Sequence, residues 1–115
     1  MQNKSKYTKN VNFSEGEKLF ARLVSYYATP RTEYPVEHAM LFGYDCLRIK
    51  GKVFAKLHNG HVVMKLPAGS ISTLVASGQA SHYELRGRIQ KEWGVISRCR
   101  DIVALGEEAR VFAES

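Results

Sequence analysis

The chain has 115 residues, of which 44% are hydrophobic and 24% are charged, and it carries a formal net charge of +6. This length is enough for the core of one domain, and the composition excludes a disordered chain and one built to span a membrane. We therefore expect a cytoplasmic protein with a single domain over residues 14–115, preceded by a flexible basic tail over residues 1–13.

The first helix is predicted to begin at Ser14. Ser14 and Glu17 have the spacing of a capping box, in which each side chain bonds the other residue's free backbone N–H. Apolar residues then recur at helical spacing, at Leu19, Phe20, Leu23, Val24 and Tyr27. Pro30 and Pro35 cannot continue a helix, so a loop over residues 29–36 should follow.

Four short strands are predicted next, at residues 37–42, 45–49, 53–58 and 61–66, with Gly43-Tyr44 separating the first two. The Asn59-Gly60 pair suits a type I′ turn, which would make His58 and His61 cross-strand neighbours. Alternation then assigns to the core face Val53, Ala55, Leu57, Val62, Met64 and Leu66. The opposite face would carry Phe54, Lys56, His58, His61, Val63 and Lys65.

The connection between the second and third of these strands decides whether the cations share a face. A three-residue loop, Lys50-Gly51-Lys52, would keep Leu47 and Ile49 in the core and gather the cations on the other face. A two-residue loop would send Leu47 and Ile49 to that other face and divide the basic surface. We favour the three-residue loop because it separates polar from apolar residues.

The C-terminal half should add a strand and two helices. Ser70 can cap a short helix that Gly78 ends, and a polar loop over residues 79–90 should follow. A last strand is predicted at residues 92–97, and Asp101 should begin a final helix that Gly106 weakens by about 1 kcal/mol. The expected fold class is α+β: one antiparallel sheet of about five strands with two to three helices on one face.

Positive charge gathers in the predicted strands. Residues 46–66 contain five cations and no acid, and residues 84–100 contain five more against Glu84 and Glu92. Such separation makes one face attractive to phosphate or to an acidic protein, although solubility alone is an alternative explanation. The candidate nucleic-acid or anion-binding residues are Arg48, Lys50, Phe54, Lys56, Lys65, Arg86 and Arg88.

Aromatic residues near these cations could stack on bases, as in single-strand binders. Tyr44 and Tyr83 are candidates for this role. Phe54 is favoured because alternation puts it beside Lys56, away from the core, whereas a strand tryptophan such as Trp93 more often fills the core.

Catalytic and metal chemistry have little support in the sequence. His58 and His61 would supply two metal ligands, but zinc needs three or four, and Cys46 and the other histidines have no predicted position beside them. Neither a nucleophile motif nor a glycine-rich nucleotide loop is present. Cys46 and Cys99 lack metal or redox spacing and should be reduced thiols. We predict a non-enzymatic protein with no catalytic residue, metal or cofactor.

Short motifs occur in order along the chain: Met40-Leu41-Phe42-Gly43, Gly51-Lys52-Val53-Phe54-Ala55, Lys65-Leu66-Pro67, Gly87-Arg88 and Trp93-Gly94-Val95. Over about residues 14–114 they resemble the TfoX/Sxy N-terminal domain, within the MmcQ/YjbR-like group. The resemblance implies a small α+β domain found in regulators of bacterial competence for DNA uptake and in many stand-alone proteins, with no catalytic residues to carry over. Family members often have Met-Phe-Gly-Gly where this chain has Leu41-Phe42-Gly43-Tyr44, and full-length regulators carry a further C-terminal helical domain that these residues do not include.

Three functions remain open at this point. The first is a regulatory or binding domain that contacts nucleic acid or an acidic partner through its basic sheet face. The second is a protein-interaction module or homodimer without nucleic-acid binding. The third is a binder of a small anionic ligand, or an enzyme, that uses the cationic segment at residues 84–100.

Overall fold

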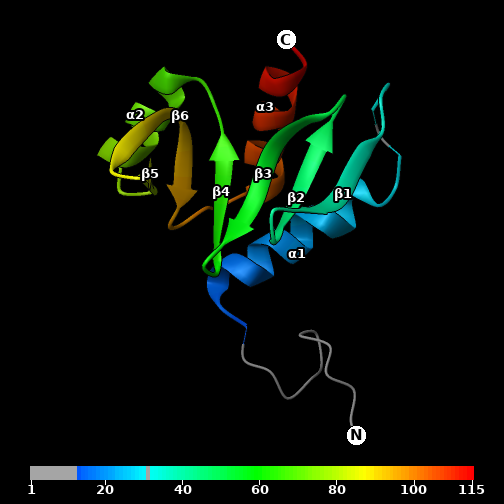
Figure 1. Cartoon of the computed structure of the whole chain (residues 1–115), viewed down its shortest axis with the longest axis horizontal. Coiled ribbons are helices and arrows are strands. Elements are labelled where there is room, and N and C mark those ends of the chain that lie inside the picture. Colours follow the sequence, from blue (N-terminus) through cyan, green and yellow to red (C-terminus); the bar gives the residue numbers. More distant parts are fainter. Residues whose placement is uncertain (1–12, 31) are drawn as a thin grey trace, which may run out of the picture.

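Three helices and six strands form within residues 13–30 and 32–115, the part of the chain that the computed structural model describes. In chain order they are α1 (Glu15–Tyr27), β1 (Val36–Leu41), β2 (Tyr44–Ile49), β3 (Lys52–His58), β4 (His61–Lys65), α2 (Ala68–Ala76), β5 (Ala80–Leu85), β6 (Arg88–Ile96) and α3 (Ile102–Glu114). All strand pairs are antiparallel, in the spatial order β1-β2-β3-β4-β6-β5 (Figure 1). The predicted α+β class is confirmed, with six strands rather than about five. The predicted tail over residues 1–13 lies, except for Phe13, outside the described residues.

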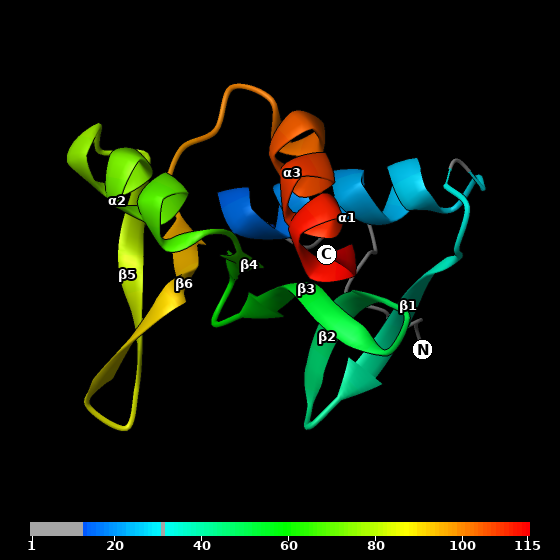
Figure 2. The same cartoon turned by 90° about the horizontal axis from the view of Figure 1, so that it is seen from above.

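The helices all cover one face of the sheet, and no described element covers the other face (Figure 2). Among the described residues, no helix has both the length and the apolar character needed to cross a membrane. The main core lies between the helices and the sheet. Its largest fully buried side chains include Phe20, Leu23, Phe54, Ile71 and Ile102.

Helix α1 begins against the turn between β3 and β4. The predicted capping box is present, because Ser14 Oγ accepts from the Glu17 backbone N–H and the Glu17 carboxylate accepts from that of Ser14. Ser14 Oγ also donates to the Gly60 carbonyl oxygen at 2.8 Å. A Cβ atom on Gly16 would lie 2.1 Å from that same oxygen, so only glycine permits this contact.

Close packing of α1 and α3 explains the glycine inside α3. A Cβ atom on Gly106 would lie 2.7 Å from Leu23 Cδ2. The residue that weakens α3 by propensity therefore lets the two helices approach. Asp101 caps α3 as predicted, by accepting a hydrogen bond from the Ala104 backbone N–H.

The four hairpins of the described chain close in the same way, with a two-residue turn whose second residue is glycine. The turns are Phe42-Gly43, Lys50-Gly51, Asn59-Gly60 and Arg86-Gly87, with positive φ at both positions of each. His58 pairs with His61, as predicted. The predicted Gly43-Tyr44 connection is displaced by one residue, and the predicted three-residue loop Lys50-Gly51-Lys52 is wrong, because Ile49 pairs directly with Lys52.

A β-bulge in β3 compensates for the shorter turn. Leu47 pairs with Ala55 while Arg48 pairs with Val53, so Phe54 is an extra residue that β2 does not match. The bulge turns Phe54 into the core, where it is fully buried and its ring centroid lies 5.7 Å from that of Tyr27. The prediction that Phe54 lies on the outer face and Val53 on the core face is therefore wrong. Leu47 nevertheless stays in the core.

The C-terminal half departs from prediction at two places. Residues 79–90 are not a polar loop, because β5 and the start of β6 form a hairpin there; the predicted strand at 92–97 is the second half of the longer β6. Helix α2 begins after Pro67 without a side-chain cap, so Ser70 is not its cap; Ser70 Oγ instead donates to Glu108. Gly78 ends α2 with a φ of 78°, as predicted.

Candidate functional site

The face of the sheet that lacks helices, called the open face below, is curved. The β1–β2 and β5–β6 hairpins both bend away from the helices, one on each side of β3 and β4 (Figure 2). Cross-strand pairing sets one row of residues across all six strands, namely Ala39, Cys46, Lys56, Val63, Val95 and Ser81. Because directly paired residues share a face, this row puts Lys56 near the middle of the open face.

The Lys56 ammonium is surrounded by aromatic rings. Its Nζ atom lies 5.5 Å from the ring centroid of Tyr44, 4.8 Å from that of Tyr83 and 5.2 Å from that of Trp93. Lys65 pairs with Trp93 across the strands, and its Nζ atom lies 5.7 Å from the same indole. All of these distances fall within the range of cation–π attraction. We call Tyr44, Tyr83 and Trp93 the aromatic cluster.

His58 braces two members of the aromatic cluster. Its Nδ1 atom lies 3.2 Å from the Tyr83 hydroxyl, within hydrogen-bond distance, and its ring centroid lies 4.7 Å from that of Tyr44. His61, its cross-strand neighbour, directs Nδ1 to the Asn59 carbonyl oxygen at 3.0 Å instead. No group of three potential metal ligands occurs among the residues that the structure describes.

Side chains beneath the aromatic cluster are buried although no helix covers them. Cys46 is 2% exposed and Val63 is 1% exposed, and both belong to the Lys56 row of the open face. Burial raises the pKa of the Cys46 thiol above its ordinary value, which disfavours the nucleophilic thiolate. Both Cys46 and Cys99 are free thiols, as predicted. The open face thus has a firm apolar floor below its cations.

The predicted site residues do not all gather here. Lys56 and Lys65 lie together on the open face, while Arg48 on the same face is held by Glu37, with Nε and Oε1 2.8 Å apart. Lys50 occupies a turn and lies 4.4 Å from the Tyr34 ring centroid. Exposed Arg86 and Arg88 lie at the tip of the β5–β6 hairpin, flanking the central pair from one side (Figure 2).

The aromatic assignment is reversed, by the bulge for Phe54 and by the β4–β6 pairing for Trp93. Phe54, the favoured stacking residue, is in the core, and Trp93, expected in the core, is half-buried on the open face. The pairing of Trp93 with Lys65 gave no signal in the sequence, because it joins β4 to a strand that follows α2 and β5. The sequence suggested His58 only as a poorly supported candidate metal ligand. Its contact with Tyr83 could not be predicted, because Tyr83 lies in strand β5, which was not predicted.

A cleft adjoins the open face where β3 and β4 diverge. The two strands pair only from Ala55 and Met64 toward their turn, and the end of α3 lies behind the gap (Figure 1). The cleft has a volume of about 550 Å³ and is lined by Lys52, Val53, Lys65, Glu92, Trp93, Phe112, Ala113 and Ser115. Lys65 and Trp93 therefore belong to both the cleft and the open face.

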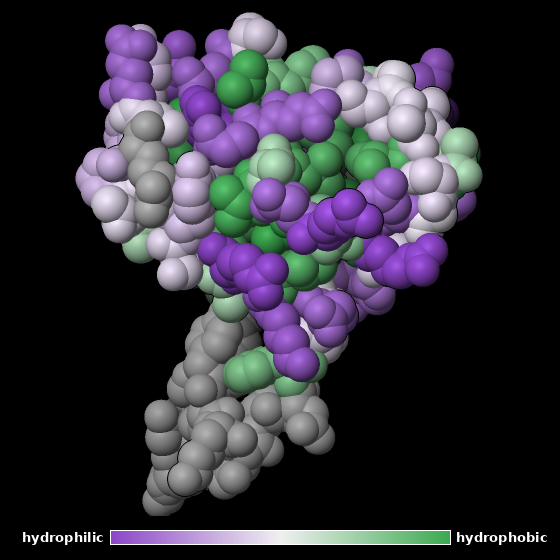
Figure 3. Space-filling view, turned by 180° about the vertical axis from the view of Figure 1, so that it is seen from behind, coloured by the Kyte–Doolittle hydropathy of each residue, from purple (hydrophilic) through white to green (hydrophobic). Residues whose placement is uncertain are grey.

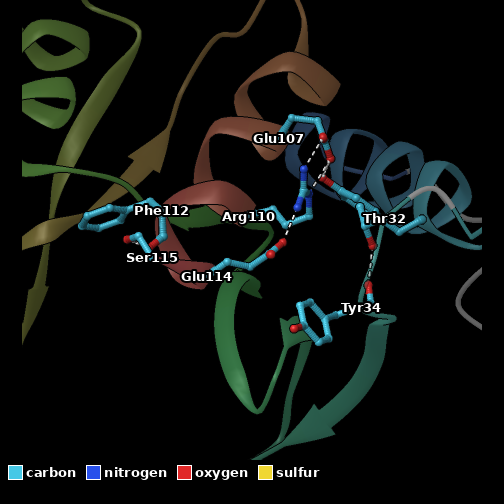
Figure 4. A network of polar contacts seen from close by, with 8 residues as sticks. Thr32, Tyr34, Glu107, Arg110, Phe112, Glu114 and Ser115 are labelled. Carbon is cyan, nitrogen blue, oxygen red and sulfur yellow. Dashed lines mark hydrogen bonds and ion pairs between the residues drawn. The ribbon is translucent and has the colours of Figure 1, made fainter.

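The helix side of the molecule has a different character. Hydrophobic residues gather in its middle among hydrophilic ones (Figure 3). A hollow between α2 and α3 is lined in part by Leu74 and Leu105. Arg110 of α3 lies between Glu107 and Glu114 and bonds both, and the Tyr27 hydroxyl donates to Glu107 (Figure 4). These groups pair with one another and join α1 to α3, so we interpret the network as one that stabilises the packing of the two helices.

The open face therefore combines cations, a buried tyrosine, two half-buried rings and a buried floor, with no described helix above it. This arrangement suits the binding of an extended anionic chain better than acid–base or metal chemistry. No protein-family model, no curated protein and no solved structure matches the chain, so the geometry of the open face is the basis for assigning a function.

Proposed function

We propose that this protein is a non-enzymatic binding domain that holds a single-stranded nucleic acid on its open face. The observation that carries the proposal is the association of Lys56 and Lys65 with the aromatic cluster. Single-strand binders combine cations that track the phosphates with rings on which bases stack. The resemblance to competence regulators suggests a regulatory use, and the free thiols suit the reducing cytoplasm.

Binding would exchange one set of ring contacts for another. A cation over an aromatic ring contributes about 0.5–2 kcal/mol, and a base stacked on a ring contributes about 1–3 kcal/mol. A phosphate could therefore draw the Lys56 ammonium off the rings while a base takes its position on Trp93. The flexible lysine stem allows this movement without a change in the strands.

A single strand fits this face better than a duplex. The faces of duplex bases are stacked on one another and are not available to protein rings, whereas single strands expose them. Sequence readout of a duplex by a helix needs that helix in the major groove, and none of the described helices lies on the open face (Figure 2).

Fluorescence anisotropy with a labelled single-stranded oligonucleotide at several salt concentrations tests the proposal. If Lys56, Lys65, Arg86 and Arg88 neutralise about four phosphates, a plot of log affinity against log salt should have a slope of about −2.8. Absence of binding at low salt, or an affinity that salt leaves unchanged, would contradict the proposal. An NMR titration should confine the shifts to β3, β4 and the β5–β6 hairpin.

A protein partner is the second candidate, favoured by apolar side chains on the hairpins. Met40 is 61% exposed on β1 and Ile89 is 52% exposed on β6. Large exposed apolar groups often mark protein contacts. Sedimentation at several concentrations separates the two functions, since self-association without oligonucleotide binding favours the partner, and a monomer that binds the strand favours the nucleic acid.

A further inference from the structure

Phe42, at the tip of the β1–β2 hairpin, combines an unfavourable backbone with an exposed ring. Its φ is 52°, in the left-handed region that bulky side chains rarely occupy. Its side chain is 96% exposed, so it packs against almost nothing in the described chain. Neither local conformational preference nor burial accounts for phenylalanine at this position.

The three equivalent turn positions make the contrast clear. Asn59 has the residue type that a type I′ turn favours at this position. Lys50 adopts the same conformation and gains a cation–π contact with Tyr34. Arg86 offers a charge at the opposite hairpin tip. Phe42 is the member of the set whose side chain has an apolar ring and no packing to offset its backbone.

The position of Phe42 links it to the open face. Leu41 and Tyr44 form the last pair before the turn, so Phe42 is two residues from a member of the aromatic cluster. The hairpin bends toward the side of the open face and away from the helices (Figure 2). A strand that stacks on Tyr44 and continues outward would pass this tip.

We propose that Phe42 is a stacking residue for a base of the strand bound on the open face. This inference rests on the proposed function and extends the aromatic cluster by one ring, at the edge where the strand leaves the protein. Stacking on a ring accepts any base, so the contact adds affinity without sequence preference. A residue kept in a strained conformation at an exposed tip is typical of a functional position.

The Phe42→Asn variant tests this inference because its two effects should have opposite directions. Asparagine tolerates positive φ, so the midpoint of thermal unfolding should stay the same or rise. The affinity for a single-stranded oligonucleotide should fall by about tenfold, the loss of one stacked base. The salt dependence of binding should not change, since no charge is removed.

Two further variants at Phe42 serve as matched controls. Phe42→Trp keeps a stacking ring and should retain the affinity, and strand binding should quench more emission than it does in the wild type, where Trp93 is the one indole. Phe42→Leu keeps an apolar side chain without a ring and should lose most of the affinity that Phe42→Asn loses. Retained affinity for the oligonucleotide in Phe42→Leu would overturn stacking by the Phe42 ring.

The wild-type chain, measured beside the variants, separates the two levels of proposal. Binding by the wild type that Phe42→Asn leaves unchanged would overturn the role of Phe42 alone. Absence of binding by the wild type would overturn the proposed function and this inference with it. An unchanged or higher midpoint of thermal unfolding, together with weaker binding in the same Phe42→Asn protein, would support both the proposed function and the role of Phe42.

Discussion

Lys56 should contribute both to the stability of the chain and to the proposed binding of a single strand. Replacing it with methionine keeps an unbranched apolar side chain but removes the charge near three rings. We expect Lys56→Met to lower the free energy of unfolding by about 1 kcal/mol. The slope of log affinity against log salt should become shallower by about 0.7, the value for one phosphate contact on a single strand.

Urea unfolding and the salt series measure these two effects of Lys56→Met. Lys18→Met is the matched control, because Lys18 is exposed on α1, on the other side of the molecule. It removes the same charge and should leave the salt slope unchanged. Equal slopes for both variants would show that net charge, and not the open face, controls binding.

Buried titrating groups give the protein a defined response to alkaline pH. Burial raises the pKa of the Cys46 and Cys99 thiols above 9.0 and that of the Tyr27 hydroxyl above 10.0. Each group binds its proton more tightly in the folded chain, so its contribution to stability is complete at lower pH and is lost as the pH rises. The free energy of unfolding should therefore fall from about pH 9 upward.

Urea unfolding at a series of pH values measures this alkaline loss. Cys46→Val removes one titrating group of similar size and should make the decline with pH less steep. A free energy of unfolding that rises over the same interval would contradict the sign of the argument.

At the scale of the elements, the bulge in β3 turns Phe54 into the core, whereas Phe42 in the β1–β2 turn faces solvent. Phe54 is 0% exposed and Phe42 is 96% exposed. Phe54→Ala should lower the free energy of unfolding by about 3–5 kcal/mol, because it leaves a cavity in the core. Phe42→Ala, the same chemical change at the surface, should alter it by only about 0.5 kcal/mol. Urea unfolding measures both variants, and equal losses of free energy would contradict the placement of Phe54 in the core.

Contact between α1 and the β3–β4 turn gives a second test at this scale. Gly16→Ala introduces a Cβ atom against backbone, 2.1 Å from the Gly60 carbonyl oxygen. The free energy of unfolding should fall by about 1–3 kcal/mol, even though alanine favours a helix. Gly69→Ala in α2 meets nothing within 4 Å and should instead stabilise the chain, by up to about 1 kcal/mol. Calorimetry of both variants shows whether contact or helix propensity decides.

Local signals explain which elements could be predicted. The caps at Ser14 and Asp101 and the Asn59-Gly60 turn depend on residues a few positions apart, and the structure has all three. The bulge depends on the register between β2 and β3, which alternation within one strand does not report. Strand β5 was missed because it is an edge strand, and its polar residues such as Ser81 and Glu84 hide the period of two.

For the whole molecule, the distribution of charge along the sequence predicted which lysines share the open face, but not the aromatic rings that surround them. Lys56 and Lys65 were predicted on one face, and they lie there. The rings that surround them come from β2, β5 and β6, and their meeting depends on the strand order and on the bend of two hairpins (Figure 2). No spacing along the chain records either property.

The strand order also sets a sequence of assembly. Strands β1 to β4 are neighbours in both chain and space, so their hairpins can form while synthesis continues. β6 reaches β4 only after α2 and β5 have been made, and it brings Trp93 beside Lys65. The open face is thus complete only once β6 has paired with β4, so a chain that lacks this pairing also lacks the contact between Lys65 and Trp93.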